Sequence, residues 1–240
     1  MTTAVLRSAQ AGAVLTSLSV GGARHVTMPL ASATQVALSR LTRILLLVAV
    51  ALCLGAPTAG AVPAKKLDNN LAALWTTILQ TPSAQNSFGT GGAAFACFNL
   101  GGTVAPFDDV AVESCPVKPG TQIFVAANSV ECSTFEGNGT TEDELRNCAV
   151  KGDQVVPTVT VDGKSVPVHL VETSLVNIDL PADSILGPPV LPEQVPAGPG
   201  LSVARGWVTL LDPLTPGTHT IVINTEGNPT ITTTIVVQGQ

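Results

Sequence analysis

Two glutamates, Glu131 and Glu136, have the residue type and the spacing that acid–base chemistry would need. They are five positions apart in the sequence, and Cys132 lies between them. One protonated and one ionised carboxyl group can act as general acid and general base on a glycosidic bond. Spacing along the chain gives no distance between the carboxyls. We therefore treat Glu131 and Glu136 as candidate catalytic residues of a polysaccharide-active hydrolase or lyase, which is an alternative to our leading hypothesis.

The acidic run that follows, Glu142 to Glu144, has a structural explanation. Thr141 and Glu144 are three positions apart, which is the spacing of a capping box. Acidic side chains are also favourable at the positive end of a helix. The pattern predicts a short helix that continues to Cys148.

Other candidates for chemistry are few. Asp108, Asp109 and Glu113 could gather around calcium, but no Asp-x-Asp-x-Asp loop is present, so solvated loop charges are the better interpretation. The sequence contains no G-x-G-x-x-G, Walker, H-E-x-x-H or G-x-S-x-G motif. We therefore predict neither a metal nor a cofactor.

Cysteine usage indicates a covalent scaffold. Four cysteines, Cys97, Cys115, Cys132 and Cys148, follow a predicted export leader, and an even count in an exported chain indicates disulfides. Three connectivities are possible. We favour Cys97 with Cys115 and Cys132 with Cys148, because each pair then closes a short loop. The spacings are wider than the close pairs of zinc sites, and an even count leaves no unpaired catalytic thiol.

The first 61 residues are expected to be that leader. They contain four arginines and no acidic residue, and the apolar run from Ile44 to Leu54 precedes Ala59-Gly60-Ala61. A charged region, an apolar region and a small-residue site in this order are typical of a secretory signal peptide, so cleavage is predicted after Ala61. A start at Met28 would give a more ordinary leader length and stays open as an alternative. The uncharged stretch from Ile44 to Val62 is too weakly apolar in its second half for a membrane span.

Removal of the leader would leave residues 62–240 as one domain. This part has seven basic and seventeen acidic residues, a net charge of −10. Such a charge argues against nucleic acid and anionic membrane surfaces as partners, and it favours solubility outside the cell. The expected location is therefore extracellular or in the cell envelope.

Hydrophobic periodicity predicts a helix at the start of this domain and strands after it. The helix is expected from Leu67 to Gln80, with Asp68 as its N-cap and with Trp75 in an apolar stripe that covers one end or an open edge of a sandwich. Residues 83–120 are expected to be mostly loops with one or two weak strands. Residues 122–127 are predicted to form a strand.

A hairpin is predicted around Asp162-Gly163, a pair that favours a type I′ turn. The turn would pair Val161 with Lys164, Val159 with Val166, Pro157 with Val168, and Val155 with Leu170. These residues would form one apolar face, which leaves His169 facing the solvent. A strand is predicted at 176–180. The proline-rich segment 181–200 is interpreted either as a partner-contact loop or as a crossing between sheets.

The last forty residues contain three β-branched runs, at 206–211, 218–225 and 231–237, which predict three consecutive antiparallel strands. The segment Leu214-Thr215-Pro216-Gly217-Thr218-His219-Thr220-Ile221 resembles the E–F corner of fibronectin type III and related immunoglobulin-like modules. In that family a Tyr at this corner bonds to upstream backbone. The resemblance implies that His219 takes this place as a corner hydrogen-bonding residue.

Together these patterns predict an all-β, antiparallel sandwich of about eight strands, immunoglobulin-like or jelly-roll-like, with a short N-terminal helix and two disulfides. The chain also resembles uncharacterised exported bacterial proteins of actinobacterial type, through the Cys132 to Gly137 segment and the Gly206 to Leu211 run. The leading hypothesis is a non-catalytic binding module whose partner is an extracellular protein or, less favoured because aromatic residues are scarce, a glycan. The alternatives are the hydrolase or lyase above and a purely structural envelope protein.

Overall fold

The computed structural model describes residues 63–86, 97–107, 114–152, 154–188, 191 and 193–239, and all of them belong to one compact unit. The predicted leader with its cleavage site and Met28 lies outside the described residues, as do Asp108, Asp109 and Glu113. Within the described part, no helix is long and apolar enough to cross a membrane.

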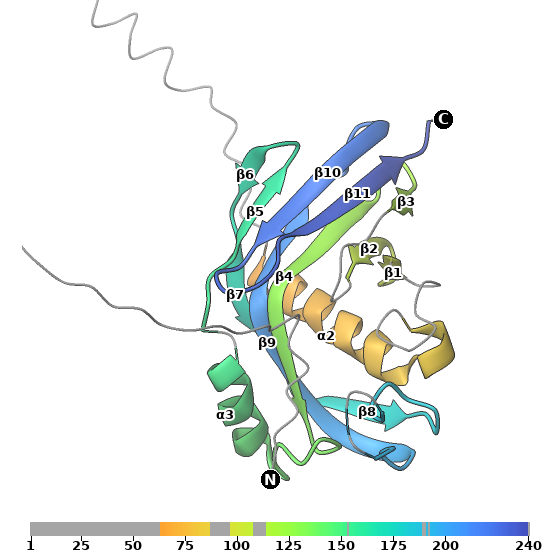
Figure 1. Ribbon diagram of the computed structural model, residues 1–240, viewed down its shortest axis with the longest axis vertical. Coiled ribbons are helices and arrows are strands. Elements are labelled where there is room, and N and C mark those ends of the chain that lie inside the picture. Colours follow the sequence, from red (N-terminus) through yellow and green to blue (C-terminus); the bar gives the residue numbers. More distant parts are fainter. Residues whose placement is uncertain are drawn as a thin grey trace, which may run out of the picture. The chain divides into compact units, whose positions relative to one another are not determined.

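The strands form two sheets, as expected for a mostly β protein (Figure 1). The six-stranded sheet has the order β1-β2-β4-β9-β7, and β8 also pairs with β9. Its strands are β1 (Cys97–Asn99), β2 (Thr103–Pro106), β4 (Gln122–Ser133), β7 (His169–Glu172), β8 (Val176–Leu180) and β9 (Gly198–Leu211). The five-stranded sheet has the order β3-β11-β10-β5-β6. Its strands are β3 (Cys115–Val117), β5 (Thr158–Val161), β6 (Lys164–Val166), β10 (Gly217–Asn224) and β11 (Ile231–Val237).

The sheets are not wholly antiparallel, which corrects the expectation. β2 pairs with β4 in parallel through Thr103 and Gln122, and β3 pairs with β11 in parallel through Cys115 and Ile235. Both exceptions involve three- or four-residue strands from the loop-rich segment before β4. These short strands have little alternating pattern of their own, so the neighbouring long strands determine their direction.

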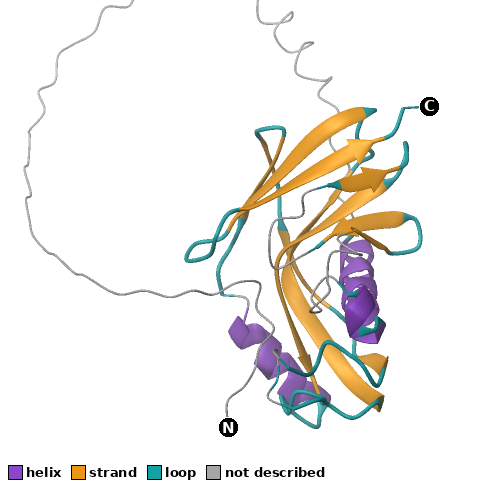
Figure 2. Ribbon diagram, turned by 45° about the vertical axis from the view of Figure 1, so that its right-hand side comes forward, coloured by secondary structure: helices purple, strands orange, loops and turns teal. Residues whose placement is uncertain are grey.

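The two longest strands, β4 and β9, organise the core. They pair along ten positions, with one irregularity between Ala126 and Asn128. At one end, Ile123 of β4 and Leu211 of β9 pack in one cluster with Ile221 and Ile235 of the five-stranded sheet. Farther along, the helices α2 (Ala64–Gln80) and α3 (Glu142–Gly152) lie on opposite sides of these strands (Figure 2). The same two strands therefore contribute to three separate apolar clusters.

Helix α2 differs from its prediction at the start and in its position. It begins after Pro63, and no side chain caps it, because Asp68 lies inside the helix and accepts a hydrogen bond from the Asn69 amide. Its buried stripe packs against the face of the six-stranded sheet rather than against an end or an edge. Trp75 is buried in this stripe and meets Phe107 edge to face, with ring centroids 5.7 Å apart.

The hairpin has the predicted turn but is shorter than predicted. Val161 pairs with Lys164, and Val159 pairs with Val166. The pairs Pro157–Val168 and Val155–Leu170 are wrong, because the chain leaves this sheet after Val166 and β7 joins β9 in the other sheet. Pro167 has no backbone N–H to continue the ladder. The change of sheet leaves Leu170 exposed and buries Val171, while His169 is exposed as predicted.

The connection between β8 and β9 corrects one of the two interpretations of residues 181–200, the crossing between sheets. β8 and β9 are neighbours in one sheet, so the segment is not a crossing between sheets. Its side chains Ile185 and Leu186 are buried in the core with α2, so they are not free to contact a partner. The crossing occurs one connection later, between β9 and β10. The three C-terminal strands therefore do not form one sheet, although β10 and β11 pair as predicted.

Candidate functional site

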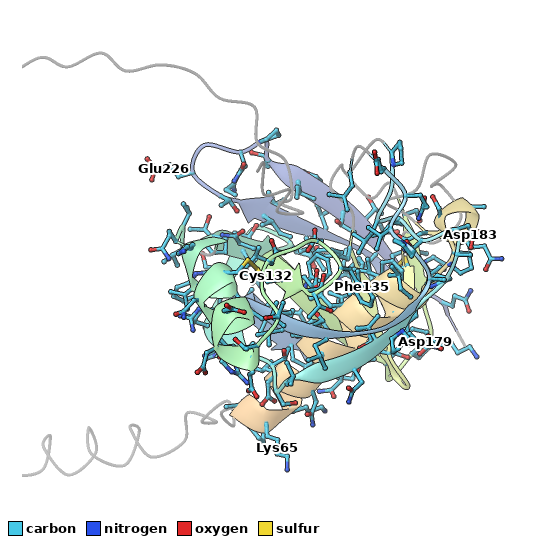
Figure 3. All side chains as sticks on the ribbon, turned by 90° about the horizontal axis from the view of Figure 1, so that it is seen from below. Lys65, Cys132, Phe135, Asp179, Asp183 and Glu226 are labelled. Carbon is cyan, nitrogen blue, oxygen red and sulfur yellow. A yellow bond between two sulfur atoms is a disulfide. The ribbon has the colours of Figure 1, made fainter. Side chains whose placement is uncertain are left out.

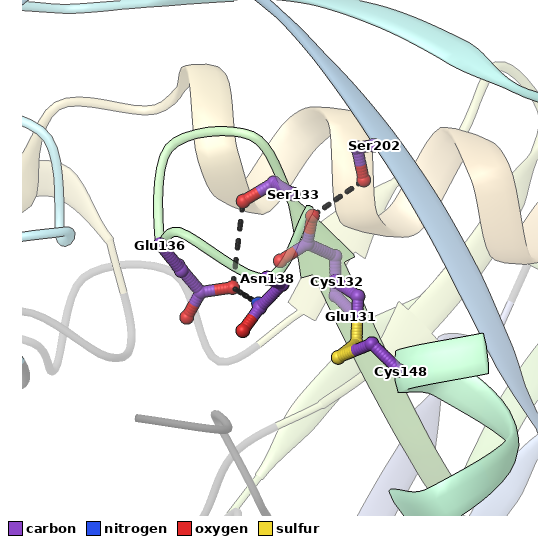
Figure 4. Close-up of a disulfide and its surroundings, with 7 residues drawn as sticks. All are labelled: Glu131, Cys132, Ser133, Glu136, Asn138, Cys148 and Ser202. Carbon is purple, nitrogen blue, oxygen red and sulfur yellow. Dashed lines mark hydrogen bonds between the residues drawn. A yellow bond between two sulfur atoms is a disulfide. The ribbon is translucent and has the colours of Figure 1, made fainter. Parts of the chain in front are cut away.

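The structure brings Glu131 and Glu136 together beneath a turn. Glu131 lies on β4, on the side of the sheet that faces α2, and Glu136 lies on the turn formed by residues 134–140 (Figure 4). Figure 4 shows the two carboxyl groups turned toward one another, and each has one buried oxygen without a hydrogen-bond partner, Glu131 Oε2 and Glu136 Oε1. We refer to these two groups as the acid pair. Only four residues separate the two glutamates in the sequence, and the chain reverses direction immediately after β4 ends at Ser133.

Three neutral donors surround the acid pair. The Ser202 hydroxyl on β9 donates to Glu131 Oε1 at 2.5 Å. The Asn138 amide donates to Glu136 Oε2 at 2.9 Å, and the Ser133 hydroxyl donates to the same oxygen at 3.4 Å. Glu131 is fully buried, and its Oε2 has no hydrogen-bond partner.

The surroundings raise the pKa of both carboxyls. Burial is the largest cause in each case, because removal from water disfavours the charged form. At Glu136 the charge of Glu131 and the hydrogen bond between the two groups raise the pKa further. At Glu131 the hydrogen bonds from Ser202, Glu136 and Ser133 act in the opposite direction. Burial therefore favours the protonated form of both carboxyls.

This geometry does not suit sugar hydrolysis. Glycosidase carboxyls stand roughly 5–9.5 Å apart and flank an accessible substrate. Here Glu131 has no exposed surface, so it cannot flank an accessible substrate. An exposed flat aromatic ring would also favour a glycan ligand. Trp75 does not provide one, because it is buried.

A separate surface feature was not anticipated from the sequence. Among the described residues, the exposed large apolar side chains are Val150, Val155, Val156 and Leu170, with exposed fractions of 42%, 37%, 56% and 38%. They come from α3, from the connection after it and from β7. Together with the half-buried Trp207 on β9, we name them the apolar patch.

Strand register places two members of the apolar patch, Leu170 and Trp207, side by side. Trp207 pairs with Leu170 on one side and with Asn128 on the other, so these three share one face of the sheet. The Asn128 amide donates to the backbone oxygen of Val155 at 2.8 Å, which fixes the 155–156 segment next to this row.

Helix α3 brings the remaining member to the same place. Arg146 of α3 bonds to Glu172, which lies two residues after Leu170 on β7. Val150 follows Arg146 by one helical turn, and the helix runs toward Asn128, since Gly152 packs on Val130. Val150 therefore lies on the same face of α3 as Arg146, one turn nearer to Gly152.

Charged groups border the apolar patch. Glu172 accepts hydrogen bonds from Arg146 and from Arg205, the latter at 3.3 Å, and Arg146 also pairs with Glu142 at 2.5 Å. Two arginines and two glutamates balance, so this border carries no net charge. An apolar centre with a polar border is the usual composition of a protein interface.

His219 lies at the corner between the sheets. Its Nδ1 is 2.7 Å from Asp162 Oδ2, and its Nε2 is 2.8 Å from the backbone oxygen of Thr215, four residues upstream. Asp162, in the hairpin turn, also accepts a hydrogen bond from the Thr220 amide. The hydrogen bond with Asp162 is the largest cause that raises the pKa of His219, followed by the bond to Thr215.

The four cysteines form two disulfides, Cys97–Cys115 and Cys132–Cys148. The first connects β1 of one sheet to β3 of the other, and the second ties α3 to β4. The capping box at the start of α3 is present, since the Thr141 amide donates to Glu144 Oε2 at 3.0 Å and the Glu144 amide donates to Thr141 Oγ1 at 3.4 Å.

No family model matches the chain, and no curated protein matches it. Among solved structures, the chain is similar to the solution structure of amebosin, with 10% sequence identity over 56% of this chain and 96% of that chain. The TM-score is 0.22, which is too low to support an argument about fold or function.

Proposed function

We propose that this chain is an exported, non-catalytic module of the extracellular space or cell envelope that binds another protein through the apolar patch. The observation that carries the proposal is the gathering of the exposed large apolar side chains of the described residues around Trp207. Contiguous exposed apolar surface with a polar border marks interaction sites on soluble proteins.

The chemistry of the apolar patch favours a protein over a glycan. The exposed members of the apolar patch, Val150, Val155, Val156 and Leu170, are aliphatic and offer no hydroxyl or amide that would recognise sugar hydroxyls, and its one aromatic ring, Trp207, is half-buried. A folded partner that presents aliphatic or aromatic side chains would bury them, and its own polar groups would meet the balanced border of Arg146 and Glu172.

Two further features support export and the finer fold assignment. The disulfides Cys97–Cys115 and Cys132–Cys148 are typical of chains that mature in an oxidising compartment. We interpret the two sheets as an immunoglobulin-like or jelly-roll-like sandwich of an actinobacterial-type exported protein. The bond from His219 to upstream backbone at the β9–β10 corner supports the immunoglobulin-like form, because the family's corner Tyr makes an equivalent bond.

The proposal is tested by site-specific photo-crosslinking in intact producing cells. A crosslinker is placed at Val156 in the full chain, and a matched control carries it at Glu226, an exposed residue in the turn between β10 and β11 (Figure 3). We expect a discrete crosslinked protein from position 156 that is absent from position 226. It should disappear when Leu170→Asp is introduced, while the folded state is retained by circular dichroism.

Three outcomes would contradict the proposal. Equal or absent crosslinks at both positions would mean that the apolar patch binds no protein. A crosslinked product that consists of two copies of this chain would identify a homodimer interface instead. Turnover of a polysaccharide that is lost in Glu131→Gln would favour the hydrolase alternative.

A further inference from the structure

We propose that one proton, shared between Glu131 and Glu136, holds the 134–140 turn against β4 and β9, and that loss of this proton releases the turn. The proposal concerns a pH-sensitive contact within the fold and does not depend on the partner inferred above. It starts from an arrangement in which two acidic groups face each other without a compensating cation.

No cationic group faces the acid pair from the described elements around it. The buried residues of α2 are apolar except for Asn70, while Lys65 is exposed and Lys66 bonds to Gln122. On β8 the inward side chains are apolar, and Asp179 is exposed, as Figure 3 shows for both Lys65 and Asp179.

The remaining charged groups nearby lie on the other side of the sheet. Arg205 of β9 pairs with Glu172, and Arg146 of α3 pairs with Glu142 and Glu172. The side chains that donate hydrogen bonds to the acid pair are neutral: Ser133, Asn138 and Ser202.

Two ionised carboxylates in contact would repel each other in this dry environment. Without a counter-ion, the arrangement is stable when one carboxyl keeps its proton and donates it to the other. That hydrogen bond gives Glu131 Oε2 the partner that it otherwise lacks. Burial raises the pKa of both groups, and the charge of Glu131 raises the pKa of Glu136 further, so the proton is retained above the usual range for glutamate.

A cation is a poorer explanation than a proton. The Asn138 amide and the Ser133 hydroxyl both direct their hydrogens at Glu136 Oε2, and such donors would oppose a metal ion at that oxygen. Within the described residues, no group of three or more His, Cys, Asp and Glu side chains could hold a metal.

The turn that the acid pair anchors covers part of the core. The Thr134 amide donates to the Leu201 oxygen at 3.0 Å, and the Leu201 amide donates to Thr134 Oγ1 at 3.1 Å. Phe135 packs on the cluster beneath α2 and lies directly over Gly200, where any Cβ would meet its ring at 2.4 Å. Figure 3 shows Phe135 beside the long strands. Release of the turn would therefore expose Phe135.

The sign of the pH effect follows from the raised pKa values. The folded state binds the shared proton more tightly than the unfolded state, where glutamate titrates near 4.5. The contribution of the acid pair to stability is fully present below that pH and is lost as the pH rises through the folded-state pKa values. The turn should accordingly be closed in acid and open in alkali.

The test measures chymotrypsin cleavage after Phe135 in the mature protein with its disulfides intact. Fragments are identified by mass spectrometry after reduction, and rates are normalised to a reference peptide at each pH. We expect the rate in wild type to rise at least about tenfold between pH 6 and pH 9, since the ionised fraction grows about tenfold per pH unit. Glu136→Gln, which is neutral at every pH, should show a flat profile, and the control Glu226→Gln should behave as wild type.

Several results would overturn the proposal. A flat profile in wild type would do so, as would a wild-type profile in Glu136→Gln. Protection restored at pH 9 by 1 mM calcium and removed by chelation would show that the pair binds a cation rather than a proton. If Glu136→Gln does not fold, the wild-type carboxyl carbons are titrated by NMR. The proposal fails if every glutamate is fully ionised by pH 6.

Discussion

His219 Nδ1 lies 2.7 Å from Asp162 Oδ2, and this contact joins the β9–β10 corner to the turn of the β5–β6 hairpin. The other ring nitrogen, Nε2, faces the Thr215 oxygen at 2.8 Å. Both partners are acceptors, so both ring nitrogens must carry hydrogens for both bonds to form. The folded state therefore favours the charged imidazolium form of His219.

This relationship predicts a pH dependence of stability. Because the pKa of His219 is raised above its ordinary 6.5, its contribution is fully present below that pH and is lost as the pH rises through the folded-state value. The pKa of Asp162 is lowered, chiefly by the same bond, so its contribution is present above about 3.8 and is lost in acid. His219→Gln should lower the melting temperature at pH 5.5 by more than it does at pH 8.5.

The matched control for this experiment is His169→Gln, since His169 is exposed on β7. It should leave the melting temperature nearly unchanged at both pH values. Equal destabilisation by His219→Gln at pH 5.5 and 8.5 would show that the ring acts by packing and not through its charge.

Gly206 should not tolerate a side chain. It lies on β9 opposite Ser129, and a Cβ there would lie 2.6 Å from both the Asn128 oxygen and the Ser129 Cα. These are backbone atoms of a paired strand and cannot move aside cheaply, so Gly206→Ala should destabilise the fold by about 1–3 kcal/mol. Urea unfolding measures this, with Gly239→Ala as the control because its Cβ would meet open space. A loss below 0.5 kcal/mol, on the order of a surface substitution, would contradict the close approach.

Trp75 should act through its volume and not through its indole N–H. The side chain is buried against Phe107, and its Nε1 has no hydrogen-bond partner. Trp75→Ala should cost about 3–5 kcal/mol in urea unfolding, as expected for a large cavity. Trp75→Phe keeps a ring and removes a buried donor without a partner, so it should cost much less. Equal losses in the two variants would indicate a bond to the indole nitrogen.

The Cys132–Cys148 disulfide should be needed to keep α3 on the sheet. The helix buries only Leu145 and Ala149, which is little apolar surface for eleven residues. Replacement of both cysteines by serine should cost about 3 kcal/mol, the value expected for a closed loop of this length. Hydrogen exchange should show amides 142–152 opening before those of β4. Exchange at the wild-type rate throughout α3 would show that its packing alone is sufficient.

Local sequence patterns determined much of this protein. The type I′ turn at Asp162-Gly163, the capping box at Thr141 and the stripe around Trp75 each depend on residues only a few positions apart. The same holds for the pairing of Cys97 with Cys115 and of Cys132 with Cys148, because short loops close most easily. In such cases neighbouring residues supply all the partners that the feature needs.

Tertiary structure decided which sheet each strand joins and, with it, both candidate sites. The pattern from Val155 to Leu170 suits a long hairpin, yet β7 pairs with β9, and this choice exposes Leu170 beside Trp207. Glu131 and Glu136 are polar in sequence, yet the fold buries Glu131 completely and turns the carboxyl of Glu136 toward it. Partners such as Ser202, seventy-one positions from Glu131, are brought close only by the folded chain. Burial and charge environment depend on these distant contacts, which no local pattern encodes.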